Sequence, residues 1–94
     1  MTWIKTIPIS EADEQLRNAM ESQRELYPIE YFTPVHPTPD GESSGIVASH
    51  TLIPDALFHA FATFGSLMSP QLPLERRQHE MIATLVSVSN RCHY

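Results

Sequence analysis

The sequence holds one cysteine, three glycines and no long apolar run. The single cysteine, Cys92, cannot form an internal disulfide, which excludes a small secreted scaffold held by disulfide bonds. There is no Gly-rich phosphate loop and no Gly-x-Ser-x-Gly nucleophile motif. No apolar run approaches the ~18 residues of a membrane-spanning helix, and the N-terminus lacks the basic start and apolar core of a signal peptide. We therefore expect a cytoplasmic protein without a membrane partner.

Basic residues are also few. Six Lys and Arg face eleven Asp and Glu, which gives a net charge of −5 and a pI of about 5.4. The bases are scattered apart from the pair Arg76-Arg77, so no basic stripe exists to bind phosphates, and we expect no nucleic-acid partner. Cys92 and His93 alone are too few ligands, at the wrong spacing, for zinc. We expect neither a metal nor a cofactor.

The length and the apolar content indicate one small globular domain. The chain has 94 residues, of which 41% are hydrophobic, and a domain of this size has a thin core. The patterning predicts an all-α domain over residues 1–94, with three helices and one Pro-rich connection. The first helix is expected from Ser10 to about Leu26, with Ser10 as N-cap and Asp13 as the capping-box acid. Its apolar stripe is narrow, which is typical of a surface helix packed along one edge.

Residues 28–45 form the Pro-rich connection, with four prolines and two glycines in eighteen residues. This composition argues against regular structure, and Pro39-Asp40-Gly41 is a turn signal. The simplest interpretation is a flexible surface loop. The segment also carries apolar residues that a solvated linker would not need, so it is expected to lie against something, including another copy of the chain. Next along the chain, Ile46-Val47-Ala48 is at best a short extended piece.

Two further helices follow. The second is expected from Pro54, which suits the first helical position, to Met68, with apolar residues at three- and four-residue spacing. Its small residues, such as Gly65, permit a close approach by another helix. The third is expected from about Leu74 to Ser89, with Asn90 as C-cap.

Two residues are candidates for chemistry. Glu80 is either a surface glutamate paired with Arg76 at four-residue spacing or a partly buried carboxylate that moves protons. Cys92 is either a free thiol near a chain end or a thiolate stabilised by the start of a further helix. The neighbouring His79 and His93 are both expected to be surface histidines.

The stretch 74–94 resembles the AhpD-like alkylhydroperoxidases, in the peroxidase-related branch of the carboxymuconolactone decarboxylase superfamily. The family pattern is Arg-x-x-Glu-x-Ile-Ala followed by Val-Ser-x-x-Asn-x-Cys-x-Tyr-Cys, and residues 77–83 and 86–94 match it up to the tyrosine. Residues 53–57 and 64–68 also look like the helix that precedes this motif. The resemblance covers about residues 46–94, and the twelve-residue step from Glu80 to Cys92 equals the family spacing.

The resemblance implies an AhpD-like helical fold, of which this chain has the N-terminal part, and an antioxidant oxidoreductase that reduces hydroperoxides with a dithiol reductant. Glu80 would be the proton-relay carboxylate, and Cys92 would be the resolving thiol. The attacking cysteine would fall directly after Tyr94, and a relay histidine would come four residues later. Because the decarboxylase branch lacks the cysteine pair, Cys92 favours the peroxidase branch over lactone decarboxylation.

The end of the sequence at Tyr94 suggests a selenoprotein whose UGA codon was taken as a stop. Designed truncation, proteolysis or a misannotated gene are the alternatives, and in each case this chain by itself is expected to be inactive. The large apolar residues of the second and third helices exceed what a thin core can cover, so we also expect a homo-oligomer that completes the fold. A non-catalytic helical module that only assembles with itself is the competing hypothesis, and a carboxymuconolactone-decarboxylase-like enzyme is the third.

Overall fold

The computed structural model describes residues 3–33, 43 and 45–92. These residues form two 3₁₀ helices, η1 (Ile9–Glu11) and η2 (Ile29–Phe32), and four α-helices, α1 (Glu14–Arg24), α2 (Gly45–Ala48), α3 (Pro54–Leu67) and α4 (Arg76–Ser89). No strand occurs in this described part of the chain. The all-α prediction is confirmed for it. Val35, the turn 39–41 and His93 lie outside the described residues.

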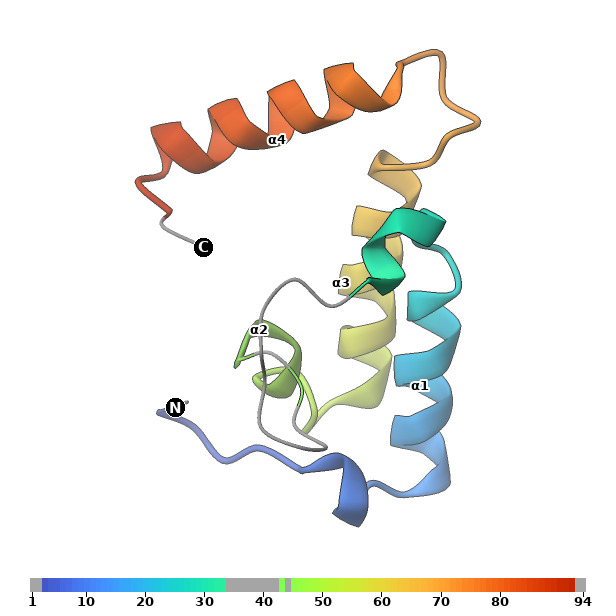
Figure 1. Ribbon diagram of the computed structural model, residues 1–94. Helices are drawn as coiled ribbons and strands as arrows, with labels where there is room; N and C mark the ends of the chain where they lie inside the picture. Colours follow the sequence, from blue (N-terminus) through green and yellow to red (C-terminus); the bar gives the residue numbers. More distant parts are fainter. Residues whose placement is uncertain (1–2, 34–42, 44, 93–94) are drawn as a thin grey trace.

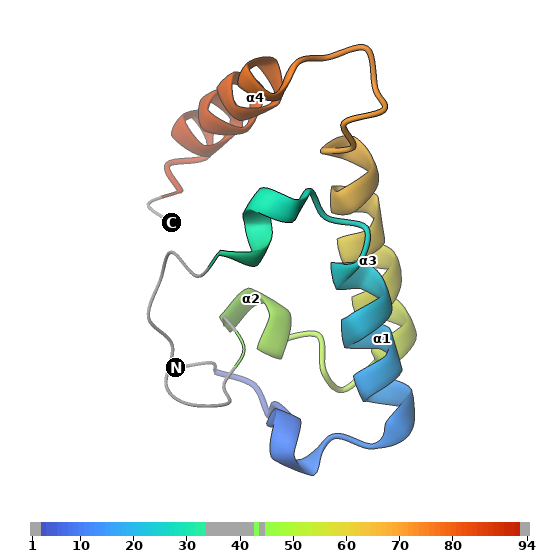
Figure 2. The ribbon, with the colours of Figure 1, turned by 45° about the vertical axis from the view of Figure 1, so that its right-hand side comes forward.

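The core lies between α1 and α3, which run side by side and in the same direction (Figures 1 and 2). Leu16 and Leu57, near the start of each helix, are 1% and 0% exposed and belong to one apolar cluster with Ala12. At the other end Gly65 lies against Leu26, and a Cβ placed on Gly65 would be 2.9 Å from the Leu26 Cβ. Close approach therefore occurs at Gly65, but the neighbour is the chain just beyond the end of α1 and not a helix.

The first helix begins later than predicted. Ser10 lies in η1, and the backbone turns extended again at Ala12 before α1 begins at Glu14. Asp13 is the actual N-cap, because its carboxylate accepts a hydrogen bond from the Leu16 N–H at 2.8 Å. The prediction of Ser10 as cap and Asp13 as capping-box acid is therefore wrong, since a carboxylate beside the first free N–H groups is itself a strong cap.

The packing of the first helix is as predicted, since α1 buries one edge and exposes the rest. Its end is earlier than predicted, at Arg24 instead of about Leu26.

The segments on either side of the core are joined by one buried hydroxyl. Thr51 is 1% exposed, and its Oγ1 accepts from the Ile7 N–H at 2.8 Å and donates to the Ala48 carbonyl at 2.7 Å. Ala48 ends α2, so residues 46–48 are helical and the extended piece considered for them is not formed. Thr51 thereby fixes the N-terminal segment against the turn that precedes α3.

The helix boundaries in the second half agree better with the sequence. Pro54 is in the first turn of α3, and Asn90 is the C-cap of α4, as predicted. The third predicted helix begins two residues late, at Arg76, because the Glu75 N–H is capped by the Gln78 side chain at 2.8 Å. Figures 1 and 2 show α4 extending away from the α1–α3 pair.

The apolar face of α4 points away from the rest of the molecule. The least exposed residues of α4 are Arg76, His79, Ala83 and Ser87, which are polar or small. The large apolar residues are between 52% and 68% exposed, namely Met81, Ile82, Leu85, Val86 and Val88. We call these five residues the outer face of α4, and nothing among the described residues covers it.

Candidate functional site

Glu80 lies on the second turn of α4 and is held from two sides. The Arg76 Nη2 lies 2.8 Å from its Oε1, in the four-residue pairing expected from the sequence, and the Tyr31 hydroxyl donates to the same Oε1 at 2.9 Å. The Glu80 side chain is nevertheless 48% exposed. The interpretation of Glu80 as a partner of Arg76 is therefore confirmed, and the proton-moving role stays a prediction.

Arg76 connects α4 to η2. Its guanidinium lies over the ring of Tyr31, 4.5 Å from the ring centroid, and its Nη1 is 3.6 Å from the Glu30 carboxylate. Glu30 and Tyr31 come from η2, and Arg76 and Glu80 come from α4. We call these four residues the η2–α4 cluster. Because the cluster is partly exposed, its ion pairs contribute little stability individually, but together they fix where α4 begins relative to η2.

Tyr31 of this cluster also belongs to a group of three aromatic rings, with Tyr27 and Phe64. The rings of Tyr27 and Phe64 meet edge to face with centroids 5.4 Å apart, and Tyr31 lies 6.0 Å from Phe64 and 6.3 Å from Tyr27. Burial raises the pKa of Tyr27 to about 12. The pKa of Tyr31 is also raised, first by burial and then by its hydrogen bond to Glu80 and the charge of that carboxylate. Both phenols therefore remain protonated at neutral pH.

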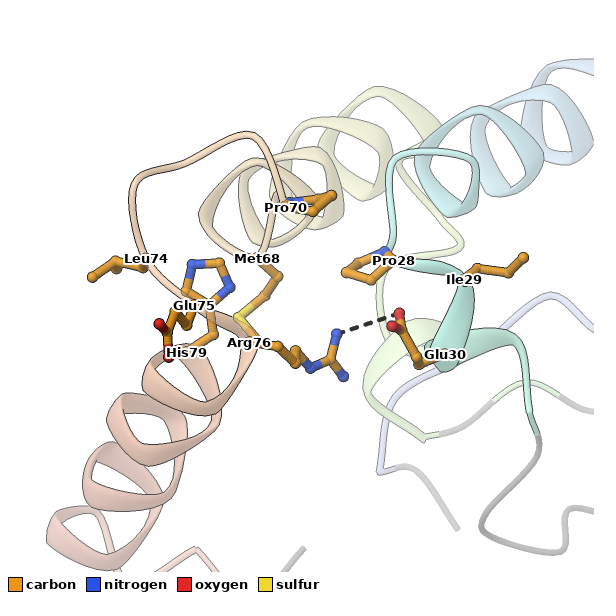
Figure 3. A pocket seen from close by; sticks show the side chains of 9 residues that line it. All are labelled: Pro28, Ile29, Glu30, Met68, Pro70, Leu74, Glu75, Arg76 and His79. Carbon is orange, nitrogen blue, oxygen red and sulfur yellow. Dashed lines mark ion pairs between the residues drawn. The ribbon is translucent and has the colours of Figure 1, made fainter.

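A pocket of about 310 Å³ opens beside the cluster, where the end of α3, the start of α4 and η2 meet. Figure 3 shows His79 beside Met68 on one side, Glu30 and Pro28 on the other, and the Arg76–Glu30 ion pair between them. His79 is only 4% exposed, so the prediction of a surface histidine is wrong. The cause is its place on the side of α4 that faces the body of the protein.

His79 lines this pocket, but one of its two ring nitrogens is shielded from it. Its Nε2 is closed off from solvent and has no hydrogen-bond partner among the described residues. A ligand that filled the pocket would therefore not reach this nitrogen unless side chains moved. The described residues contain no group of three or more His, Cys, Asp and Glu that could hold a metal ion.

Cys92 lies exposed just after α4. Asn90 caps the helix, Arg91 adopts the left-handed conformation with φ 53°, and two N–H groups turn back to the last turn. Arg91 N–H donates to the Val88 carbonyl at 3.0 Å and Cys92 N–H to the Ser87 carbonyl at 2.8 Å, which is a Schellman motif. The backbone N–H of Cys92 is thus used to end α4.

The fold does not bring the two candidate residues together within one chain. Glu80 and Cys92 are twelve positions apart along α4 and its cap, which at the rise of an α-helix separates their backbones by roughly 18 Å. Sequence reasoning missed Glu30 and Tyr31 as partners of α4. No local signal could have identified Tyr31, because it lies 49 residues before Glu80 and in the Pro-rich connection.

No family model, no curated protein and no solved structure matches this chain. No helix in the described ranges is long and apolar enough to cross a membrane.

Proposed function

We propose that this chain belongs to a thiol or selenol peroxidase that reduces hydroperoxides, similar to the AhpD-like enzymes. The observation that carries the proposal is the placement of Glu80: its carboxylate is held by Arg76 and Tyr31 on a helix that leads, twelve residues on, to an exposed Cys92. This spacing equals the interval between relay carboxylate and resolving thiol in the family that the sequence resembles. The ordered carboxylate adds a group suited to general acid–base work.

In this reaction the attacking residue is the one directly after Tyr94. Its thiolate or selenolate attacks the outer oxygen of the hydroperoxide, so the O–O bond breaks, the alcohol leaves with a proton, and a sulfenic or selenenic acid remains. The thiolate of Cys92 then attacks that sulfur or selenium and releases water, which forms the disulfide or selenenylsulfide. A dithiol reductant supplies two electrons and two protons and restores the starting state. Glu80 and the relay histidine expected four residues after the attacking residue together accept and return protons in these steps.

The activity test compares two proteins. The chain ending at Tyr94 is expected to reduce hydroperoxides no faster than a free thiol does. The extended protein, in which Cys follows Tyr94 and the natural sequence continues, is expected to turn over with a dithiol reductant. Glu80→Gln in the extended protein should lower the rate by roughly 10²-fold while the fold is retained, since a general base is removed. Turnover that is unaffected by Glu80→Gln would leave Glu80 as an ion-pair residue only.

The coding DNA gives an independent test. An in-frame UGA after the Tyr94 codon, followed by a codable helix with histidine four codons on, supports the enzyme. A UAA or UAG with no open frame beyond it supports the second candidate function.

That second candidate is a helical module that assembles with itself, and the outer face of α4 favours it. Five large apolar side chains point away from the body of the protein, and burying them against a second copy would remove them from water. The two functions are compatible, because assembly is also expected of the peroxidase. Light scattering at micromolar concentration should give a dimer or larger species, whereas a monomer of about 11 kDa would reject assembly.

A matched pair of variants locates the interface. Leu85→Lys places a charge on the outer face and should dissociate the assembly. Thr84→Lys places the same charge one position away, near Glu80, and should leave the assembly intact. If both variants affected the assembly equally, the outer face of α4 would not be the interface.

A further inference from the structure

The two contacts that hold the Glu80 carboxylate, an ion pair and a hydrogen bond, reach the same oxygen. Arg76 Nη2 lies 2.8 Å from Oε1, and the Tyr31 hydroxyl lies 2.9 Å from Oε1. Within the described ranges no residue donates to Oε2. Oε1 therefore takes both the ion pair with Arg76 and the hydrogen bond from Tyr31, whereas Oε2 takes neither. The two oxygens of one side chain are therefore unequal.

We propose that Tyr31 is a positioning residue for Glu80: it holds Oε1 so that Oε2 is the oxygen that exchanges protons with the reacting group. This inference rests on the proposed peroxidase function. A carboxylate bound only to Arg76 keeps freedom to rotate and to follow a flexible guanidinium. A second donor from a different element fixes the plane of the carboxylate, and a general base is effective only when its accepting atom is held in place.

Tyr31 is suited to this task because its ring is held on several sides. Tyr27 and Phe64 pack against it, and the Arg76 guanidinium lies 4.5 Å from its ring centroid. The charged groups that act on its hydroxyl are Glu80, Arg76 and Glu30. Since η2 supplies the phenol and α4 supplies the carboxylate, the bond also sets the register between these two elements. The orientation of Glu80 therefore depends on a residue that is remote in sequence.

Tyr27 provides a matched control. It belongs to the same aromatic group and would lose the same hydroxyl in Tyr27→Phe. Among the described residues no hydrogen bond to its hydroxyl is formed, and its raised pKa has burial as its cause. A comparison of Tyr31→Phe with Tyr27→Phe therefore isolates the bond to Glu80 from the packing of the rings.

The contact itself is tested on the 94-residue chain. Tyrosine labelled with ¹³C at Cζ reports the titration of each phenol separately by NMR. Glu80→Gln should lower the pKa of Tyr31, because the negative carboxylate that raises it is removed, and should leave the pKa of Tyr27 at about 12. An unchanged Tyr31 titration in Glu80→Gln would overturn the proposal.

The role in the reaction is tested on the extended protein. Tyr31→Phe should lower kcat by about threefold to tenfold, the effect of one hydrogen bond, and leave KM unchanged because Tyr31 touches no substrate. Tyr27→Phe should leave both within about twofold. A rise in KM alone, or equal losses in the two variants, would overturn the positioning role. Absence of turnover with Tyr31 and Glu80 intact would overturn the peroxidase function, and this inference would fall with it.

Discussion

The α1–α3 pair and helix α4 differ in the exposure of their large apolar residues. In the pair, Leu16 and Leu57 are buried in one apolar cluster, and the polar residues other than Gln23 are exposed or only partly buried. In α4, the side that faces the body carries Arg76 and His79, and the outer face carries the large apolar residues. The pair therefore contains an apolar core formed within one chain. The apolar pattern of α4 suits a surface that the described residues do not supply.

The two regions also differ in the kind of contact that holds them, which is apolar in the pair and polar at α4. The α1–α3 pair is joined by apolar packing and by the close approach at Gly65. The contacts of α4 to η2 are a hydrogen bond, ion pairs and the stacking of Arg76 on Tyr31. Exposed polar contacts of this kind contribute less stability than buried apolar area does. We therefore expect α4 to open more readily than the pair.

The largest expected effect comes from identical substitutions in the two regions. Leu57→Ala removes a side chain that is 0% exposed and should cost about 2–5 kcal/mol of unfolding free energy, measured by urea denaturation. Leu85→Ala, at a residue that is 67% exposed, should change it by less than about 0.5 kcal/mol. A loss for Leu85→Ala that grows with protein concentration would instead show that α4 is buried in an assembly.

A smaller effect is expected at Gly65. An added Cβ would lie 2.9 Å from the Leu26 Cβ and 3.2 Å from the Leu26 carbonyl oxygen, so Gly65→Ala should destabilise the protein by about 1–3 kcal/mol. The neighbouring and exposed Ser66 provides the control, and Ser66→Ala should be neutral or slightly stabilising. Equal thermal midpoints for the two variants would contradict the close packing of α1 and α3.

The aromatic group between the two regions should give the protein an alkaline limit. The pKa of Tyr27 is about 12 in the folded protein, above the ordinary value of 10.0. A raised folded pKa means that the contribution to stability is complete below pH 10 and is lost as the pH rises towards 12. Thermal melts of the wild type should therefore fall over this interval, and Tyr27→Phe should weaken the dependence. If the melting temperature of Tyr27→Phe fell with pH as steeply as that of the wild type, other groups would be the cause of the fall.

The smallest expected effect concerns the end of α4. Arg91 has φ 53°, a conformation that glycine adopts without the steric cost of a Cβ, so Arg91→Gly should stabilise the end of the helix by about 0.5–1 kcal/mol. Slower amide exchange in the last turn of α4 would report this gain. Asn90→Gly is the control, since Asn90 has φ −84° and gains nothing from glycine there.

The helix ends that carry strong local signals could be predicted from the sequence. Pro54 and Asn90 hold the expected places because a proline in the first turn and a C-cap depend on a few neighbouring residues. The start of α1 could not be decided in the same way, since Ser10 and Asp13 are both good caps. The structure selects Asp13, whose carboxylate bonds the Leu16 N–H.

The candidate site could be predicted only within α4. The Arg76–Glu80 pair follows from four-residue spacing. The burial of His79 and the bond from Tyr31 depend on how α4 meets η2, and that meeting depends on contacts between residues far apart in the chain. A sequence pattern with one period gives the faces of a helix but does not say which face turns inward. For α4 the inward face is the polar one.

The hydroxyl of Thr51 has a consequence for the rate of folding. It joins Ile7 to the turn before α3, 44 residues later, so the core forms only when a long segment of chain closes on itself. Closure entropy grows with the logarithm of segment length, and halving the segment would gain only about 0.6 kcal/mol. The protein can therefore carry a long Pro-rich connection at small thermodynamic cost, while its folding is slower than that of a helical bundle with short loops.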